Sequence, residues 1–112
     1  MSSKFNQVWI TATTDAVESK SFSAFGAGTN VAIQCSNLGV GETLTLQSYD
    51  ISLAGGADWV NVKVAGADFA CSDENNLMMF ALDVLSYRVV KSATANPIGV
   101  AITSNQPIYV GT

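Results

Sequence analysis

The sequence predicts an all-β protein, a single-domain antiparallel β-sandwich that is jelly-roll-like and has about eight or nine strands. Two observations support this prediction. Runs of alternating apolar and polar residues recur along the chain, and turn-forming clusters of Gly, Asn, Asp and Pro separate them. The length of 112 residues suits one domain over residues 1–112. A helical turn within Glu74–Leu85 is the competing assignment.

The first half of the chain is predicted to hold four strands. They are Phe5–Thr13, Val17–Phe25, Asn30–Ser36 and Glu42–Leu53. In the first of them, strict alternation would place Trp9 and Ile10 on opposite faces. Residues 1–10 form either an edge strand or an N-terminal arm.

The second half continues the pattern. A strand over Trp59–Val64 would place Val60, Val62 and Val64 on one half-buried face, and the Gly55-Gly56 pair would reverse the chain before it as a hairpin loop. Asp68–Cys71 is too short to assign. The remaining strands are expected over Leu77–Leu82, Leu85–Val90, Ile98–Thr103 and Gln106–Val110. Pro107 in the last segment suits an edge strand, because proline cannot donate a ladder hydrogen bond.

The low content of charged residues indicates which kinds of partner the protein could bind. Charged residues make up 12% of the chain, about half of the roughly 25% that is usual in soluble domains. A weakly charged polar surface is easier to desolvate, which favours a protein with much of its surface against partners. An ordinary monomer with a hydroxyl-rich exterior is the alternative. The net charge of −4 and the scattered cations argue against nucleic acid, which needs a basic patch.

The sequence lacks the residues that common catalytic and metal sites need. It contains no histidine, which removes Ser-His-Asp and Cys-His arrangements and every His-containing zinc site. Cys35 and Cys71 have no CxxC spacing, so we expect free, buried thiols, with a disulfide or a reactive thiol as alternatives. Asp73–Asn76 is expected to be a solvated turn, with a calcium site as the alternative. We therefore expect no enzyme, no catalytic residue, no metal and no cofactor.

No segment predicts membrane insertion or export. The N-terminal residues lack an apolar stretch typical of a signal peptide. The longest dense apolar run, Leu77–Leu82, is far shorter than the roughly 20 residues that cross a bilayer. Synthesis in a cytoplasm and no membrane partner are the expectations.

Aromatic side chains are the candidates for contacts with partners. Trp59 follows a glycine turn and is either a core contact between the sheets or an interface anchor, a role in which Trp is enriched. We take Trp9, Trp59, Tyr109 and Phe5 as interface candidates. A carbohydrate platform is an alternative use of the rings, but they are dispersed over separate strands.

Three segments between residues 41 and 100 form a pattern: GETLTLQ at 41–47, GGADWVNVKV at 55–64 and SYRVVKSATANPIGV at 86–100. This pattern resembles one in the small head-decoration, or staple, proteins of short-tailed bacteriophages. The turn order Gly-Gly-Ala-Asp differs from the Asp-Gly-Gly order of that pattern.

The resemblance implies a non-enzymatic virion protein that binds the outside of the capsid and ties neighbouring capsomers together. Its partners would be the major capsid protein and further copies of itself, as a dimer or trimer. It would be made in the host cytoplasm and reside on the capsid exterior. Strand-edge pairing by Phe5–Thr13 or Gln106–Val110 is the expected contact mode. The alternative is a tail or receptor-binding module that recognises host glycan or protein.

Overall fold

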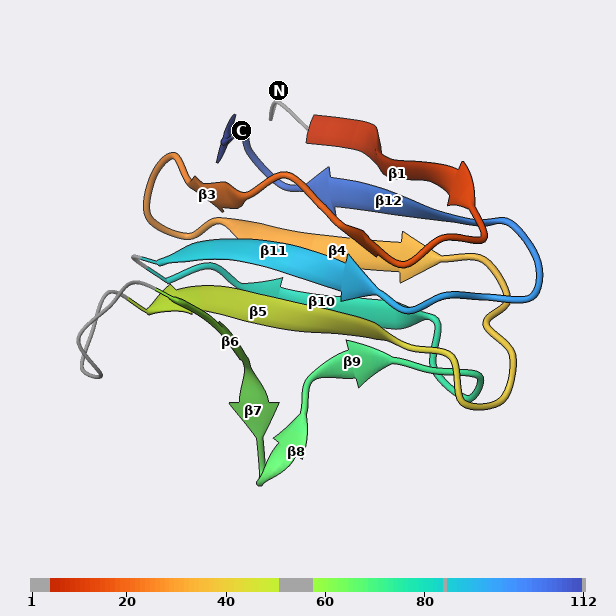
Figure 1. The fold of residues 1–112 in the computed structure, drawn as a ribbon. Helices are drawn as coiled ribbons and strands as arrows, with labels where there is room; N and C mark the ends of the chain where they lie inside the picture. The colour runs from red at the N-terminus through yellow and green to blue at the C-terminus, as the bar shows by residue number, and fades with distance from the viewer. Residues whose placement is uncertain (1–4, 51–57, 84, 112) are drawn as a thin grey trace.

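A computed structural model describes residues 5–50, 58–83 and 85–111, and these residues form two packed antiparallel β-sheets (Figure 1). In chain order the strands are β1 Phe5–Thr13, β2 Val17–Glu18, β3 Phe22–Ala24, β4 Asn30–Cys35, β5 Leu44–Asp50, β6 Asp58–Asn61, β7 Lys63–Val64, β8 Ala67–Asp68, β9 Ala70–Cys71, β10 Leu77–Ala81, β11 Ser86–Lys91, β12 Ile98–Ser104 and β13 Ile108–Val110.

The strand order is that of a jelly roll. The first sheet has the order β1-β12-β4-β10, and the second has the order β13-β3-β11-β5-β6, with β2 also paired to β11 and β9 to β5. The chain therefore crosses between the sheets from β1 to β3, β4, β5, β10, β11, β12 and β13 in turn. Such crossing places the first long strand beside the last long one, as in a double Greek key. The predicted all-β sandwich is confirmed.

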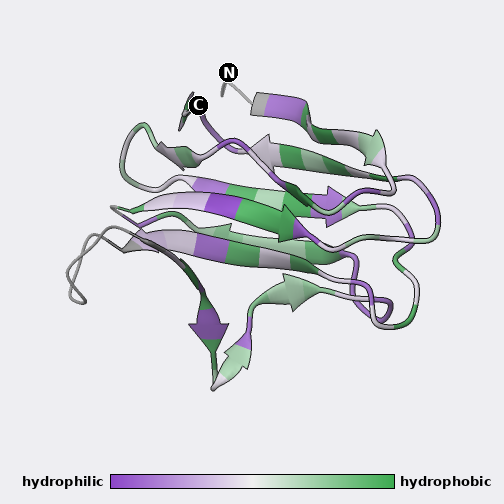
Figure 2. Cartoon of the chain, in the orientation of Figure 1, coloured by the Kyte–Doolittle hydropathy of each residue, from purple (hydrophilic) through white to green (hydrophobic). Residues whose placement is uncertain are grey.

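Alternation builds the core between the sheets. Along β12, Ile98, Val100 and Ile102 point inward and are buried, while the residues between them are half-exposed. In the second sheet, Leu46 and Val89 lie opposite each other in the register and are also buried. Figure 2 shows that hydrophobic residues gather on the strands of both sheets. Each such side chain contributes about 1.5–3 kcal/mol through burial, so the inward rows hold the sandwich together.

A β-bulge changes the predicted alternation in β1. The register against β12 shifts between Val8 and Ile10, so the strand carries one extra residue there. Both Trp9 and Ile10 are consequently buried, and the expectation that they lie on opposite faces is wrong. The Trp9 ring meets Phe22 edge-to-face, with 5.7 Å between the ring centroids. Phe5–Thr13 is a strand at the edge of the first sheet. Of the two alternatives for residues 1–10, an edge strand or an N-terminal arm, the described residues from Phe5 onward therefore follow the edge strand.

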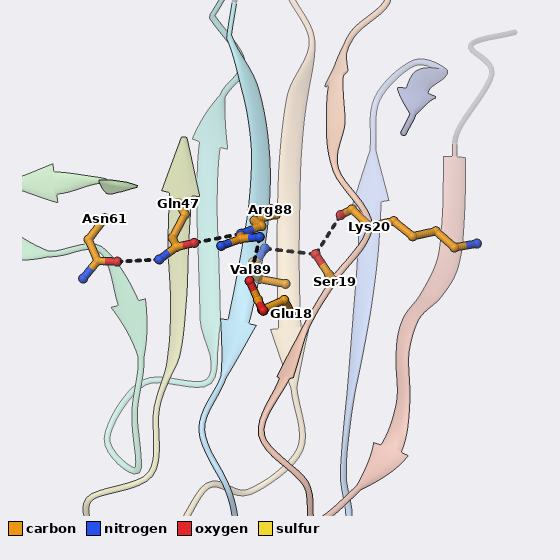
Figure 3. Close-up of polar contacts among 7 residues, drawn as sticks. All are labelled: Glu18, Ser19, Lys20, Gln47, Asn61, Arg88 and Val89. Atoms are coloured by element: carbon orange, nitrogen blue, oxygen red, sulfur yellow. Dashed lines mark hydrogen bonds and ion pairs between the residues drawn. The ribbon is translucent and has the colours of Figure 1, made fainter. Parts of the chain in front are cut away.

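The predicted strand Val17–Phe25 is two strands, β2 and β3. The Ser19 side chain is the reason, because its Oγ accepts the Val89 N–H at 3.0 Å where a backbone carbonyl would otherwise do so (Figure 3). The Ser19 N–H donates to the Val89 carbonyl at 2.9 Å. Pairing with β11 therefore persists across the break, while the regular ladder does not.

The predicted strand Trp59–Val64 is also divided. The Val62 N–H bonds the Leu46 carbonyl at 2.9 Å, and β7 then leaves the sheet to pair with β8 in a hairpin that projects beyond the sandwich (Figure 1). Ala65 and Gly66 form its turn, both with positive φ, as a type I′ hairpin turn requires. Val62 packs against the core, but Val60 and Val64 are exposed, so the predicted valine face is wrong.

Three further expectations have different outcomes. The helical alternative for Glu74–Leu85 is wrong, because Leu77–Ala81 is strand β10, paired with β4. Asp68–Cys71, which was too short to assign, contributes to β8 and β9. The hairpin loop at Gly55-Gly56 and the end of the predicted strand Glu42–Leu53 lie outside the described residues, while β5 covers Leu44–Asp50.

A lysine closes one end of the core. Lys91 ends β11 with its side chain pointing inward, and it is 0% exposed. Its ammonium group donates to the Asp15 carbonyl at 2.8 Å, the Ser92 carbonyl at 3.0 Å and the Thr94 hydroxyl at 3.1 Å. All three ammonium donors thus have acceptors, which is what a buried cation requires.

Glu42 ties together two loops near this end of the sandwich. Its carboxylate accepts the Gly39 N–H at 2.6 Å and the Ala95 N–H at 2.8 Å, and these bonds, led by that from Gly39, lower the pKa of Glu42. A carboxyl whose pKa is lowered by folding stabilises the fold above its ordinary pKa, and this contribution is lost as the pH falls through the lowered value.

We therefore expect the variant Glu42→Gln to melt below the wild-type temperature at pH 7. The gap between the two melting temperatures should narrow as the pH falls below about 4.3, the ordinary Glu value. Thermal unfolding followed by circular dichroism across pH 2.5–7 measures the melting temperatures of wild type and variant. Glu74 is exposed, so Glu74→Gln serves as the control. A gap that stays constant over this range would show that the charge of Glu42 does not stabilise the loops.

Candidate interaction surfaces

The outward side of the first sheet is free of charge. None of the residues of β1, β4, β10 and β12 is Asp, Glu, Lys or Arg. Their cross-strand register places two outward rows side by side. The rows are Asn6, Thr103, Ala32 and Met79, and Val8, Ala101, Gln34 and Leu77. We call these eight residues the uncharged face.

The uncharged face is low in the middle and raised at both edges. Val8 on β1 is 65% exposed and Met79 on β10 is 68% exposed, while the small side chains of Ala32 and Ala101 lie between them. A shallow hollow of about 410 Å³ lies beside Met79, and another of about 570 Å³ lies beside Val8. Depletion of charge is typical of the centre of a protein interface, because no ion has to be desolvated there.

The outward side of the second sheet is built differently. A chain of side-chain contacts crosses the four strands β6, β5, β11 and β2 (Figure 3). Gln47 Nε2 donates to Asn61 Oδ1 at 3.0 Å, and Arg88 Nε donates to Gln47 Oε1 at 2.8 Å. Arg88 Nη1 lies 2.6 Å from Glu18 Oε2. These polar groups satisfy one another, so this part of the sheet is held in one arrangement.

The aromatic interface candidates lie in three different environments. Trp9 is 8% exposed within the core, so we no longer include it among the interface candidates. Trp59 lies on the outward side of the second sheet, with the Arg88 guanidinium 4.6 Å from its ring centroid, and is not a core contact between the sheets. Tyr109 on β13 is 56% exposed. Phe5 begins β1 opposite Ser104, and its side chain lies outside the described part of the chain.

The two segments expected to pair through their edges do lie at sheet edges. β1 is the outer strand of the first sheet, and β13 is the outer strand of the second. Both edges lie on the same side of the sandwich (Figure 1). Pro107 immediately precedes β13 rather than lying within it. These edges present unpaired backbone groups to a neighbouring chain.

The two cysteines meet inside the core. Cys35 on β4 and Cys71 on β9 are both free thiols and both buried. A hydrogen bond with Cys35, together with burial, raises the pKa of Cys71. The Cys35 thiol is also 3.8 Å from the carbonyl oxygen of Asn76. The prediction of free, buried thiols is confirmed.

We expect iodoacetamide to alkylate neither thiol readily in the native protein. Alkylation needs an accessible thiolate, and both thiols are buried. Labelling at pH 7.5 followed by intact-mass analysis should be at least about 100-fold slower than in 6 M guanidinium chloride, because it requires opening of the core. Rapid native labelling of one site would instead indicate a reactive cysteine.

Asp73–Asn76 forms a tight turn between β9 and β10. The Ser72 N–H bonds the Asn75 carbonyl at 2.7 Å, and the Ser72 hydroxyl accepts the Glu74 N–H at 3.3 Å. Within the described ranges, no group of three or more His, Cys, Asp or Glu side chains could hold a metal ion.

Comparison with known proteins gives no relative. No protein-family model, curated protein or solved structure matches the chain. A search of the described residues for a helix long and apolar enough to span a membrane finds none.

Sequence reasoning missed the uncharged face, because Ala, Thr, Asn and Gln form no motif. One signal was present in the sequence. The segments 5–13, 30–35, 77–81 and 98–104 lack charge, and the charged residues of the chain lie between them, except Lys4, which precedes the first. Only the strand order reveals that these four segments form one sheet.

Proposed function

We propose that this protein is a non-enzymatic structural component of a virion, which binds the outer surface of an assembled capsid and holds neighbouring capsomers together. The observation that carries the proposal is the uncharged face, a broad surface with no charge on any of its four strands. The resemblance of residues 41–100 to phage head-decoration proteins supports it. The jelly-roll order is compatible with it, since this architecture is common in viral shells, although the fold alone fixes no function.

The mechanism is stabilisation by binding. A protein that binds the assembled shell, and not its dispersed subunits, stabilises the shell by about 2.7 kcal/mol per site when its free concentration is 100 times the Kd. The uncharged face would contact one capsomer. The edges of β1 and β13 offer backbone donors and acceptors to a neighbouring capsomer or to a second copy of the chain.

Co-sedimentation tests the proposal. Purified protein is mixed with capsid shells that lack it and, separately, with dispersed major capsid protein. We expect saturable binding to the shells, none to the subunits, and a higher temperature of shell disruption after binding. Equal binding to shells and subunits, or binding to neither, would contradict the proposal.

The alternative is a tail or receptor-binding module built on the same fold. The two functions differ in copy number, since a shell component is present in numbers comparable to the capsid subunits and a tail module in a few copies per particle.

A further inference from the structure

A cleft lies at one end of the second sheet, where the loops from β3 to β4 and from β10 to β11 cross between the two sheets. It has a volume of about 740 Å³ and lies where β3, β11 and β13 run side by side. Ser23 and Ser86 face each other across β3 and β11 and form its floor, and Tyr109 lies opposite Ser23 on β13. The register thus places a ring beside two hydroxyl groups in one row. Volumes of 300–1,000 Å³ are typical of small-molecule sites.

The surroundings hold the cleft in shape. The Tyr109 ring packs on Phe25, with 4.9 Å between the ring centroids. The loop at residues 26–28 forms the rim, and its backbone is fixed from outside: Gln106 Nε2 donates to the Ala27 carbonyl at 2.9 Å, and Asn105 Nδ2 donates to the Gly28 carbonyl at 3.0 Å. A preformed cleft loses little conformational freedom when a ligand binds.

The chemistry of the lining selects the ligand. An exposed aromatic ring can stack on the apolar C–H face of a sugar, and serine hydroxyls can donate to and accept from sugar hydroxyls. Asp83 in the lining of the cleft and the net charge of −4 disfavour anions. With Asp83 as the only carboxylate among the lining residues, the cleft lacks the ligand set that a metal cation needs.

We propose that this cleft binds a neutral carbohydrate, one or two hexose units in size, with Tyr109 as the stacking platform and Ser23 and Ser86 as hydrogen-bonding partners. The site includes none of the residues of the uncharged face, and sugar binding needs no capsid. A protein docked through the uncharged face would leave the cleft open to solvent.

Saturation-transfer NMR on the isolated protein, with lactose, maltose and α-1,3-mannobiose at millimolar concentration, tests the proposal. We expect transfer to at least one sugar, strongest at the ring protons of its apolar face. Tyr109→Ala should weaken binding at least tenfold, and Tyr109→Phe, which keeps the ring, should stay within about threefold of wild type.

Tyr49→Ala is the matched control, because Tyr49 lies on the same sheet outside the cleft. This variant is expected to bind the sugar as wild type does. Three results would overturn the proposal: no transfer to any of the sugars, undiminished binding by a folded Tyr109→Ala variant, or equal binding of the anionic sugar 3′-sialyllactose. Because no particle is involved, these results are independent of the capsid-binding test.

Discussion

Ala101→Asp is expected to abolish binding of the protein to capsid shells while leaving the fold intact. Ala101 lies within the uncharged face, opposite Val8 on one neighbouring strand and Gln34 on the other. A carboxylate at this point would have to be desolvated in the interface without a partner, which costs several kcal/mol. Since about 1.4 kcal/mol is a tenfold change in affinity, we expect at least about a 100-fold loss.

The control for this prediction carries the same change in charge elsewhere. Val40 is 90% exposed in the loop between β4 and β5, so Val40→Asp should bind the shells as wild type does. Co-sedimentation measures both variants, and circular dichroism verifies that each is folded. Wild-type binding by Ala101→Asp would show that the uncharged face is not the contact surface, whatever the function of the protein.

Lys91→Met is expected to lower the free energy of unfolding by about 3 kcal/mol, the largest effect on stability that we predict. Methionine replaces the aliphatic part of the side chain but leaves the Asp15 and Ser92 carbonyls and the Thr94 hydroxyl without their donor. A buried acceptor that loses its partner costs about 1–3 kcal/mol. The loops at residues 14–16 and 92–96 would also lose one of their links, and the bond from the Thr94 N–H to the Thr14 carbonyl would remain.

Urea unfolding measures this effect through a shift of the midpoint at an unchanged slope. The exposed Lys20 gives a matched control, and Lys20→Met should change the free energy of unfolding by less than about 0.5 kcal/mol. A loss below about 0.5 kcal/mol for Lys91→Met would mean that water satisfies the three acceptors equally well.

The fold class was predictable because each long strand carries its own alternating pattern. The breaks within the strands were not, because distant partners cause them. The Ser19 hydroxyl interrupts a strand by bonding Val89, and Val62 anchors to Leu46 before the β7–β8 hairpin leaves the sheet. The bulge that buries both Trp9 and Ile10 depends on the register with β12, which no local pattern specifies.

The candidate surfaces were less predictable than the fold. The low charge of the chain indicated a protein with partners. The interface candidates chosen from the sequence were aromatic residues, however, and none of them belongs to the uncharged face. Trp9 proved to belong to the core, whereas Ala32 and Ala101 mark the centre of a charge-free sheet. The cleft beside Tyr109 depends on three strands from separate parts of the sequence, so only the structure could bring its serine hydroxyls and ring together.

The copy number of this protein relative to the major capsid protein, in gradient-purified particles from its source, tests the central proposal most directly. A shell protein should be present in numbers comparable to the capsid subunits, and quantitative mass spectrometry of the particles measures the ratio. Our account predicts a fixed ratio close to that of a stoichiometric component. A few copies per particle, or none, would contradict it.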